Sequence, residues 1–329
     1  MKVLLVGPYP PPHGGVSVHV WTMCARMRQM GLQCNVLNIQ PRASSSASYI
    51  KVSGGFDLIV QLARHVLDDW TLSVHINGHN PKSWFVALLC GVATQFGCGG
   101  TVTVHSGMAP EYLRNTNAWR RMAARLACVM YDRVVCVNQE IADTVAWLGI
   151  PRLQLEIKPA FMPVSKVDSA IPEQIDRWMK RHPKFLSVTL SFRPEYGFEL
   201  LVDALSRLNR TYPRLGCLVM GSGEDRTAAE ELIRARRLGE TVLLAGDLDH
   251  QLCLTAISRS TAFVRPTFRD GDSISVREAM SMGVPVVASN VGTRPEGTLL
   301  FEAGNVEALI GQVEEALSIR GEGRERQYA

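Results

Sequence analysis

The chain has 329 residues, of which 46% are hydrophobic and 20% are charged, and its formal net charge at pH 7 is +4. It contains no low-complexity tract, no repeat of fixed period and no apolar run near the ~18 residues that a membrane span needs. These properties exclude repeat arrays and integral membrane proteins, and they predict a globular chain of two domains.

Cysteine usage and the N-terminus predict the cellular compartment. The eight cysteines are scattered among apolar neighbours with no C-x-x-C pair, which is typical of reduced core thiols in a cytoplasmic protein. The N-terminal MKVLLVGPYP is too short, and too soon interrupted by proline, to be a signal peptide. We therefore expect a first β-strand there.

Positive charge is concentrated in the first half of the chain. Residues 1–165 hold 14 Lys/Arg and 8 Asp/Glu, a net +6, whereas residues 166–329 hold 21 and 23, a net −2. The excess favours an anionic partner for the first half, such as a phosphate-bearing acceptor or a lipid surface. An uneven distribution of solvent-exposed charges, with no binding partner, explains the excess about equally well.

Residues 1–160 alternate between strand-like and helix-like segments. The small polar residues at 42–55 predict a surface loop. Strands at this spacing, with helices between them, indicate a parallel doubly wound sheet, in which ligands bind at the carboxyl ends of strands. We expect strands at 2–7, 34–39, 72–78, 100–106 and 132–138, and helices at 16–30, 117–130 and 141–149.

The pattern restarts after a proline-containing stretch, 156–174, which is the best candidate for an interdomain linker. Residues 161–329 then form a second domain of similar size. The prediction is an α/β fold of two Rossmann-like domains facing a central cleft, the default place for an active site. We expect strands at 184–190, 215–223, 241–246, 262–266 and 284–289, and helices at 197–209, 225–237, 249–259, 274–282 and 305–319.

Two features at predicted strand ends of the first domain are candidates for ligand contacts. Gly14 and Gly15 precede a helix and let a ligand approach its free amides, although turn glycines are commoner than phosphate sites. His105 ends a strand and can donate a hydrogen bond to a sugar or phosphate oxygen, although a lone histidine more often has a local structural role. No trio of histidines, cysteines or carboxylates has metal-ligand spacing, so we predict no metal site.

The stretch RDGDSISVREAMSMGVPVVAS, residues 269–289, combines several features. Ser273 or Ser275 begins a helix whose amides are able to bind a diphosphate. Glu278 lies on the second turn, where a carboxylate can accept both hydrogen bonds of a ribose diol. Asp270, in the preceding loop, can reach the hydroxyls of a second ring. Less specific loops, suited to a base and ribose, carry Gly221, Gly223 and Asp247.

The pattern P-x-x-x-D-G-x-S-x-x-x-x-E-A-x-x-x-G-x-P-V-V-A-S in this stretch resembles the signature of the retaining glycosyltransferases of family 4 (glycosyl transferases group 1), which have the GT-B fold. The resemblance extends over nearly the whole chain. It includes the N-terminal strand with its Gly-Gly loop, TVTVHS, the linker, FRPEYGFELLVDAL, VMGSGEDR and VLLAGDLDH.

The resemblance implies a role for each candidate residue. The first domain would take the acceptor and the second the nucleotide-sugar donor, and transfer would be front-face, with a departing phosphate oxygen taking the acceptor's proton. Glu278 would bind the donor ribose, Asp270 would contact the transferred sugar and His105 would hydrogen-bond that sugar. Diphosphate contacts are implied for Gly14, Gly15 and the amides of Ser273, Ile274 and Ser275.

Three departures from the family pattern bear on activity. Asp270 stands where the family has glutamate, so the carboxylate is one methylene shorter. Ser191 and Tyr196 replace the Arg and Lys that neutralise the diphosphate, which should cost several kcal/mol of transition-state stabilisation unless another cation substitutes. Arg193 is the expected substitute, with Arg265, Arg269 or Arg294 as helpers. The chain also ends soon after helix 305–319, where relatives have a helix that crosses back to the first domain.

The basic helix at 117–130 is open to two interpretations. Trp119, Met122, Leu126 and Val129 or Met130 share one face, and three arginines lie off it. Packing of that face on the sheet is the commoner arrangement for an amphipathic helix. The alternative is contact with anionic lipid or with a lipid-diphosphate acceptor.

The leading hypothesis is a metal-independent hexosyltransferase that uses a UDP- or GDP-sugar, requires no further cofactor and serves polysaccharide, lipopolysaccharide or glycolipid assembly. Its acceptor would be a glycan or a lipid-linked molecule, its location cytoplasmic or peripheral at the inner face of the membrane, and nucleic acid would not be a partner. Two alternatives are a catalytically impaired nucleotide-sugar-binding protein with a structural role and a nucleotide-sugar 2-epimerase.

Overall fold

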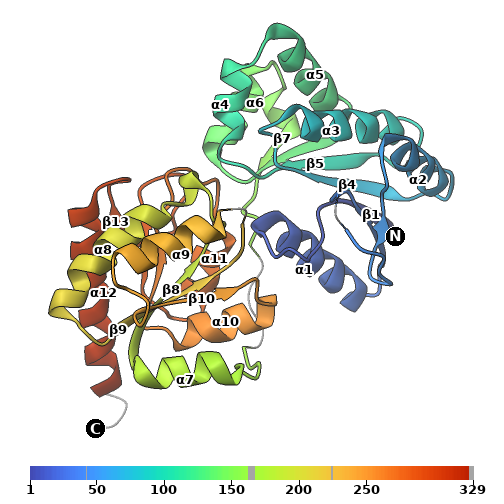
Figure 1. Cartoon of the computed structure of the whole chain (residues 1–329). Coiled ribbons are helices and arrows are strands. Elements are labelled where there is room, and N and C mark those ends of the chain that lie inside the picture. Colours follow the sequence, from blue (N-terminus) through green and yellow to red (C-terminus); the bar gives the residue numbers. More distant parts are fainter. Residues whose placement is uncertain (42, 162–166, 224, 326–329) are drawn as a thin grey trace. The chain divides into compact units, whose positions relative to one another are not determined.

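The structure is a computed structural model that describes residues 1–41, 43–161, 167–223 and 225–325 (Figure 1). The chain divides into two compact units, and each is described by itself. The first unit is Met1–Met162 together with Asp270–Asp272, and the second is Pro163–Arg269 together with Ser273–Ala329.

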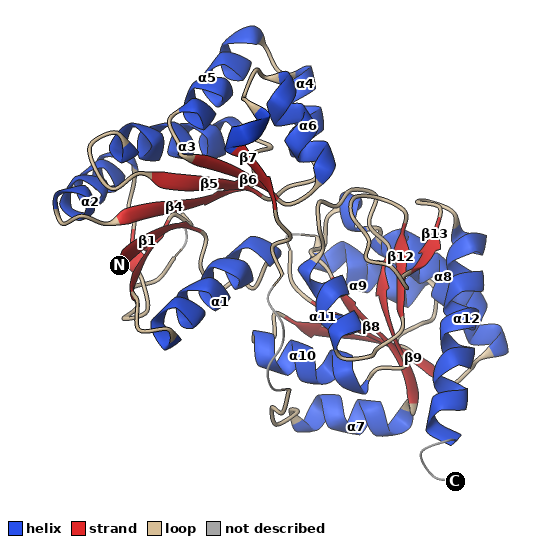
Figure 2. Ribbon diagram, turned by 180° about the vertical axis from the view of Figure 1, so that it is seen from behind, coloured by secondary structure: helices blue, strands red, loops and turns tan. Residues whose placement is uncertain are grey.

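The first unit is built on a seven-stranded sheet in the order β3-β2-β1-β4-β5-β6-β7, and every pair of neighbouring strands is parallel. Helix α1 lies on one face of this sheet, and α2, α3 and α5 lie on the other (Figure 2). The elements are β1 Lys2–Gly7, α1 Gly15–Gln29, β2 Gln33–Asn38, β3 Ile50–Lys51, α2 Gly55–Leu67, β4 Thr71–Ile76, α3 Pro81–Thr94, β5 Gly100–Val104, α4 Ala109–Asn115, α5 Ala118–Val129, β6 Arg133–Cys136, α6 Gln139–Trp147, η1 Arg152–Gln154 and β7 Leu155–Ile157.

The second unit repeats this plan with a six-stranded parallel sheet in the order β10-β9-β8-β11-β12-β13. The elements are α7 Glu173–Arg181, β8 Lys184–Thr189, η2 Pro194–Tyr196, α8 Phe198–Thr211, β9 Leu215–Met220, α9 Arg226–Ala235, β10 Val242–Gly246, α10 His250–Arg259, β11 Ala262–Arg265, α11 Ile274–Ser281, β12 Val286–Ser289, β13 Leu299–Phe301 and α12 Val306–Glu325.

Both strand orders reverse direction once, between β1 and β4 in the first unit and between β8 and β11 in the second. In open parallel sheets ligands bind at the carboxyl ends of the strands beside such a reversal. The fold therefore marks one candidate ligand position in each unit, and the predicted doubly wound sheets are confirmed.

The core of the second unit has two halves, one on each face of its sheet. Side chains alternate across the faces, so Leu186 and Val188 pack with α8, α9 and α12, whereas Phe185 packs with α7, α10 and α11. Strand β9 is buried over its whole length, as expected for a parallel strand covered on both sides. Trp178 of α7 is one of the largest members of the second half.

Side-chain caps explain where several helices begin. Asn80 Oδ1 accepts a hydrogen bond from Ser83 N at the start of α3, and Asn117 and Asn138 do the same for α5 and α6. Asp249 Oδ1 caps α10 by accepting from Leu252 N. Each cap satisfies an amide that would otherwise lack a partner in the first turn.

The structure corrects three expectations. Strand β3 and the start of α2 lie inside the predicted loop 42–55, where Ala43 and Tyr49 are buried. The predicted linker 156–174 contains the boundary between the two units, but its ends lie inside β7 and α7, and its residues 162–166 lie outside the described part of the chain. The apolar face of α5 does not pack on the sheet: Trp119 and Met122 are exposed, and Ala124, Ala127 and Cys128 are buried instead.

Among the described helices, none combines the length and the apolar character that crossing a bilayer requires. Six of the eight cysteines are buried as free thiols, and Cys98 is exposed.

We predict that Gly216→Ala destabilises the second unit. A methyl group at Gly216 would lie 2.6 Å from a ring carbon of the buried Trp178 and 2.8 Å from Cβ of His182, so the free energy of unfolding should fall by about 1–3 kcal/mol. Gly311→Ala in α12 is the matched control, because nothing lies within 4 Å of its added methyl. It should leave stability unchanged or raise it by up to ~1 kcal/mol. Urea unfolding measures both, and equal effects would contradict the packing described.

Candidate functional site

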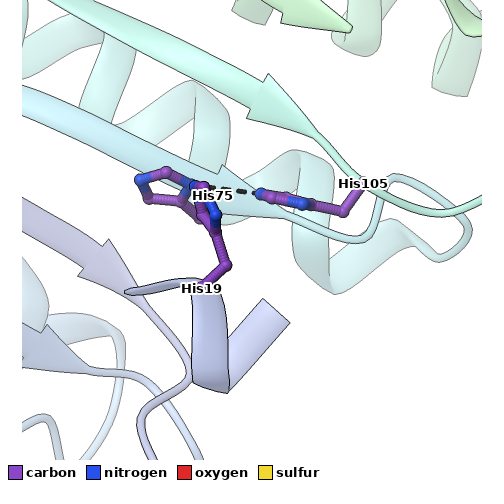
Figure 3. Close-up of side chains that lie close together, drawn as sticks. All are labelled: His19, His75 and His105. Atoms are coloured by element: carbon purple, nitrogen blue, oxygen red, sulfur yellow. Dashed lines mark hydrogen bonds between the residues drawn. The ribbon is translucent and has the colours of Figure 1, made fainter. Parts of the chain in front are cut away.

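Three histidines from separate elements meet in the first unit (Figure 3). His19 lies on α1, His75 lies in β4 and His105 follows β5 directly. Each pair of rings has its centroids 5.2–5.4 Å apart. Because β4 adjoins β1 at the reversal of strand order, this cluster occupies the candidate ligand position of the first unit.

Hydrogen bonds link His105 to the interior of the sheet. Nδ1 of His75 and Nε2 of His105 are 3.1 Å apart, and Nε2 of His75 is 3.2 Å from Ser73 Oγ. Thr101 donates its hydroxyl proton to Ser73 Oγ over 3.4 Å. Nε2 of His105 is therefore engaged within the protein, which leaves Nδ1 as the ring atom to meet a ligand.

One arrangement of protons satisfies every contact in this series of hydrogen bonds. Ser73 Oγ accepts from Thr101, so its own proton can go to Nε2 of His75. Nδ1 of His75 then carries a hydrogen and donates it to Nε2 of His105. A neutral imidazole has one N–H, so in this arrangement the hydrogen of His105 lies on Nδ1.

Burial keeps all three imidazoles neutral. It lowers the pKa of His19, and it lowers the pKa values of His75 and His105 well below the usual range, with a smaller contribution from the neighbouring rings. The backbone carbonyl of Ala160 accepts a hydrogen bond from Nδ1 of His19 over 2.8 Å. A neutral histidine donates and accepts one hydrogen bond each, which is what a relay requires.

Among the described residues, the same three rings form a group that could hold a metal ion. One nitrogen from each lies within 4.8 Å of the others. Two imidazole nitrogens on a tetrahedral zinc ion are about 3.3 Å apart, a separation that falls within this limit. The sequence alone does not reveal this trio, because its members are far apart along the chain.

Asp270 belongs to the first unit, as does the Gly14-Gly15 turn. Asn138 donates its side-chain amide to the carbonyl of Gly271 over 3.1 Å, which anchors the Asp270–Asp272 segment. The backbone of the Asp270–Asp272 segment comes so near His105 that a methyl at Gly271 would lie 2.6 Å from the His105 carbonyl. Gly14 and Gly15 are exposed at the start of α1, and nothing lies within 4 Å of a methyl placed at Gly15.

In the second unit Glu278 is buried and paired with a histidine. It lies on the second turn of α11, as predicted, with 6% of its surface exposed. His250, the first residue of α10, places Nε2 2.6 Å from Oε1 of Glu278. This contact fixes one carboxylate oxygen, and no sequence pattern singled out His250 as a site residue.

Helix α11 begins at Ile274, with Ser273 in the N-cap position. The hydroxyls of Ser273 and Ser275 are 3.2 Å apart, and the Ser273 side chain does not cap the helix. The amides of the first turn therefore have no partner from that side chain, and a helix N-terminus of this kind attracts anions.

An arginine stands beside Tyr196, the residue that replaces the family's lysine. The guanidinium of Arg265 lies 5.2 Å from the centre of the Tyr196 ring and donates to the carbonyl of Thr189 over 2.8 Å. Arg265 ends β11 and Thr189 ends β8, so this cation lies at the reversal of strand order in the second sheet. Arg193, the expected substitute, is exposed just before η2.

The remaining predicted loop residues form the rim of the second sheet. A methyl at Gly221 would lie 1.8 Å from the Leu190 carbonyl, and one at Gly223 would lie 2.7 Å from Phe192 N. These glycines are thus required for close packing of neighbouring loops, whatever their role with a ligand. Asp247 is exposed after β10.

Comparison with known proteins identifies both halves of the chain. Residues 13–160 match the profile of Glycosyltransferase Family 4, and residues 172–328 match that of Glycosyl transferases group 1. Among solved structures, Anabaena Alr3699/HepE in complex with UDP has a TM-score of 0.71 at 13% identity, covering 98% of this chain and 95% of that one. Sucrose-phosphate synthase from Thermosynechococcus elongatus also has a TM-score of 0.71, at 18% identity, over 98% and 91%.

Sequence relatives match over shorter stretches. A phosphatidyl-myo-inositol mannosyltransferase from Propionibacterium freudenreichii is 29% identical over 175 residues, which are 52% of this chain and 40% of the relative. A glycogen synthase from Mycobacterium tuberculosis is 29% identical over 110 residues, 33% of this chain and 27% of the relative. The matches thus span less than half the length of these relatives.

We predict that the first unit loses stability as the pH falls below about 6.5, the ordinary pKa of histidine. The folded state resists protonation of the half-buried His19 and of the buried His75 and His105, whereas the unfolded chain accepts those protons. The contribution of the neutral rings to the free energy of unfolding is therefore fully present above that pH. Below it, this free energy falls by up to ~1.4 kcal/mol per pH unit for each ring. His75→Asn should make the dependence of the unfolding free energy on pH less steep, by the contribution of one ring. Hydrogen exchange of β4 and β5 across the pH range tests this, and identical slopes for both proteins would contradict it.

Proposed function

Because the chain belongs to the GT-B glycosyltransferases of the group 1 type, we propose that it transfers a hexose from a nucleoside diphosphate sugar to an acceptor hydroxyl. The observation that carries this proposal is the start of α11: a helix N-terminus followed, one turn later, by the buried Glu278 held by His250. Both lie in the loops and helices that follow the carboxyl ends of the second sheet.

Glu278 would select the ribose of the donor. His250 holds Oε1, so we assign the ribose hydroxyls to Oε2. Hydrogen bonds to a charged carboxylate are about twice as strong as neutral ones, and a buried carboxylate with one oxygen fixed loses little freedom on binding. The amides of Ser273, Ile274 and Ser275 would then meet the diphosphate at the helix N-terminus.

Arg265 would neutralise the diphosphate in place of the missing Arg and Lys pair. Its guanidinium is oriented by the Tyr196 ring and the Thr189 carbonyl, so its position is fixed before a ligand arrives. A preorganised cation stabilises the charge that develops on the leaving group more effectively than a mobile one. Arg193, which is exposed, would have a lesser part, and Gly221, Gly223 and Asp247 would border the base and ribose.

His105 and Asp270 would contact the transferred sugar. With protons arranged from Thr101 through Ser73 and His75 as described, Nδ1 of His105 would be a hydrogen-bond donor, which suits a sugar hydroxyl. Asp270 would accept from other hydroxyls. Gly14 and Gly15 would leave room for the diphosphate, because a methyl at Gly15 would have nothing within 4 Å and one at Gly14 would meet only Ser17 Oγ, at 3.9 Å.

The proposed reaction is retaining and metal-independent. The acceptor oxygen forms a bond to the anomeric carbon, the bond from that carbon to the phosphate oxygen breaks, and the departing phosphate takes the acceptor's proton on the same face. Protein groups position the reactants and stabilise leaving-group charge. We propose UDP or GDP as the donor nucleotide and a glycan or lipid-linked molecule as acceptor, in polysaccharide, lipopolysaccharide or glycolipid assembly.

We predict that Glu278→Ala lowers affinity for the donor nucleotide by about 10- to 100-fold, because two charge-assisted hydrogen bonds to the ribose are lost. Titration calorimetry with UDP, GDP and ADP measures this. Glu278→Gln keeps an oxygen for His250 and should bind with intermediate affinity, which separates the ribose contact from the fold. Glu231→Ala, at an exposed position of α9, is the control. Unchanged affinity in Glu278→Ala would refute the ribose assignment.

Donor hydrolysis and transfer assays with the wild-type protein separate the proposed enzyme from a binding protein. Tight nucleotide binding with no turnover of any nucleotide sugar would identify a nucleotide-sugar-binding protein in place of a transferase.

We also predict that His75→Leu lowers kcat by about tenfold and leaves nucleotide affinity unchanged, since the hydrogen bond that sets the tautomer of His105 is lost. His75→Asn places an amide nitrogen near the position of Nδ1 and should restore part of the rate. Nitrogen-15 NMR of the His105 ring should show the proton on Nδ1 in the wild type and a mixture of tautomers in His75→Leu. Equal loss in the Leu and Asn variants, with an unchanged spectrum, would refute the relay.

A further inference from the structure

Helix α5 carries an apolar face that points into solvent. Four apolar residues recur on it at helical spacing: Trp119, Met122, Leu126 and Val129. The exposed fraction of each residue's surface is between 45% and 83%. The opposite face carries the small buried residues. We call the four exposed residues the α5 face.

The α5 face is bordered by positive charge. Helix α5 has three arginines and no acidic residue. Arg121 and Arg125 each directly precede an apolar member of the face, Met122 and Leu126, so they lie along its side. Arg121 also lies 5.7 Å from the ring of Trp147, at the end of α6, which is itself 57% exposed.

We propose that the α5 face docks on the surface of an anionic lipid bilayer. A helix with a tryptophan-containing apolar face and arginines beside it lies in the membrane interface, with the apolar side chains below the headgroups and the cations among their phosphates. The net +6 of residues 1–165 attracts such a surface over a longer range.

The charges also argue against a second copy of the chain as the occupant. Two copies that met through this face would bring Arg121 and Arg125 of both together, and like charges across an interface are unfavourable. An anionic bilayer offers the opposite sign. The inference rests on the chemistry of this surface and does not depend on the proposed transfer reaction.

Vesicle co-sedimentation of the full chain tests the proposal. The wild type should bind vesicles of phosphatidylcholine mixed with phosphatidylglycerol more tightly than vesicles of phosphatidylcholine alone, and added salt should weaken this binding. Leu126→Glu removes apolar contact and adds a repelling charge, so affinity should fall at least about tenfold. The matched control is Ile319→Glu, on α12 of the second unit, where exposure is 48% against 45% for Leu126. It should bind as the wild type does.

A second variant separates charge from apolar contact. The double substitution Arg121→Ser and Arg125→Ser should lower affinity for the anionic vesicles by about 25-fold, at about fivefold for each cation, and leave binding to phosphatidylcholine vesicles unchanged. Nucleotide affinity of all variants should equal that of the wild type, so a failure of lipid binding is distinguishable from a failure of the proposed function.

Three results would overturn the proposal. The first is a wild-type protein that shows no preference for anionic vesicles. The second is a Leu126→Glu variant that binds them as tightly as Ile319→Glu does. The third is a wild-type dimer that ignores vesicles and dissociates on Leu126→Glu substitution, which would make the α5 face a self-association surface.

Discussion

In both units the parallel strands are covered by helices on two faces, which leaves the strand ends as the place where polar side chains can meet a ligand. His105 follows β5, Arg265 ends β11, and α11 starts after the loop that follows β11. Their positions result from one constraint, because a strand buried on both sides has to be apolar until it ends. The reversal of strand order then decides which ends diverge enough to admit a ligand.

The buried polar residues of the candidate sites form hydrogen bonds with neighbouring side chains. His75 is fully inside the first sheet, yet both of its nitrogens have partners. Glu278 is likewise held by His250. An unmatched buried polar group costs about 1–3 kcal/mol, so these contacts are needed for stability. The same contacts fix the orientation of His105 and Glu278 before any ligand binds, which is how preorganised sites reduce the cost of binding.

Sequence periodicity was sufficient to predict the alternation of strands and helices and the position of Glu278 on its helix, since both are local properties. It could not bring His19, His75 and His105 together, because their proximity depends on β1 and β4 being neighbours in the sheet. The sequence offered Arg265 only as one of three helpers to Arg193, and its contact with Tyr196 is what distinguishes it from Arg269 and Arg294. In α5, periodicity showed two faces but not which one is buried; the face with Ala124 and Ala127 is buried, because small side chains permit close packing.

The outer strands of the two sheets limit how copies of the chain can associate. Strands β3 and β7 have two and three residues, β13 has three, and β10 has a register shift between Leu244 and Gly246. Short or irregular outer strands offer few backbone groups to an added strand, so continuous sheets between molecules are disfavoured. Stable oligomers or fibrils that grow by sheet extension should therefore be rare for this protein, and any specific assembly would have to use its helices and loops.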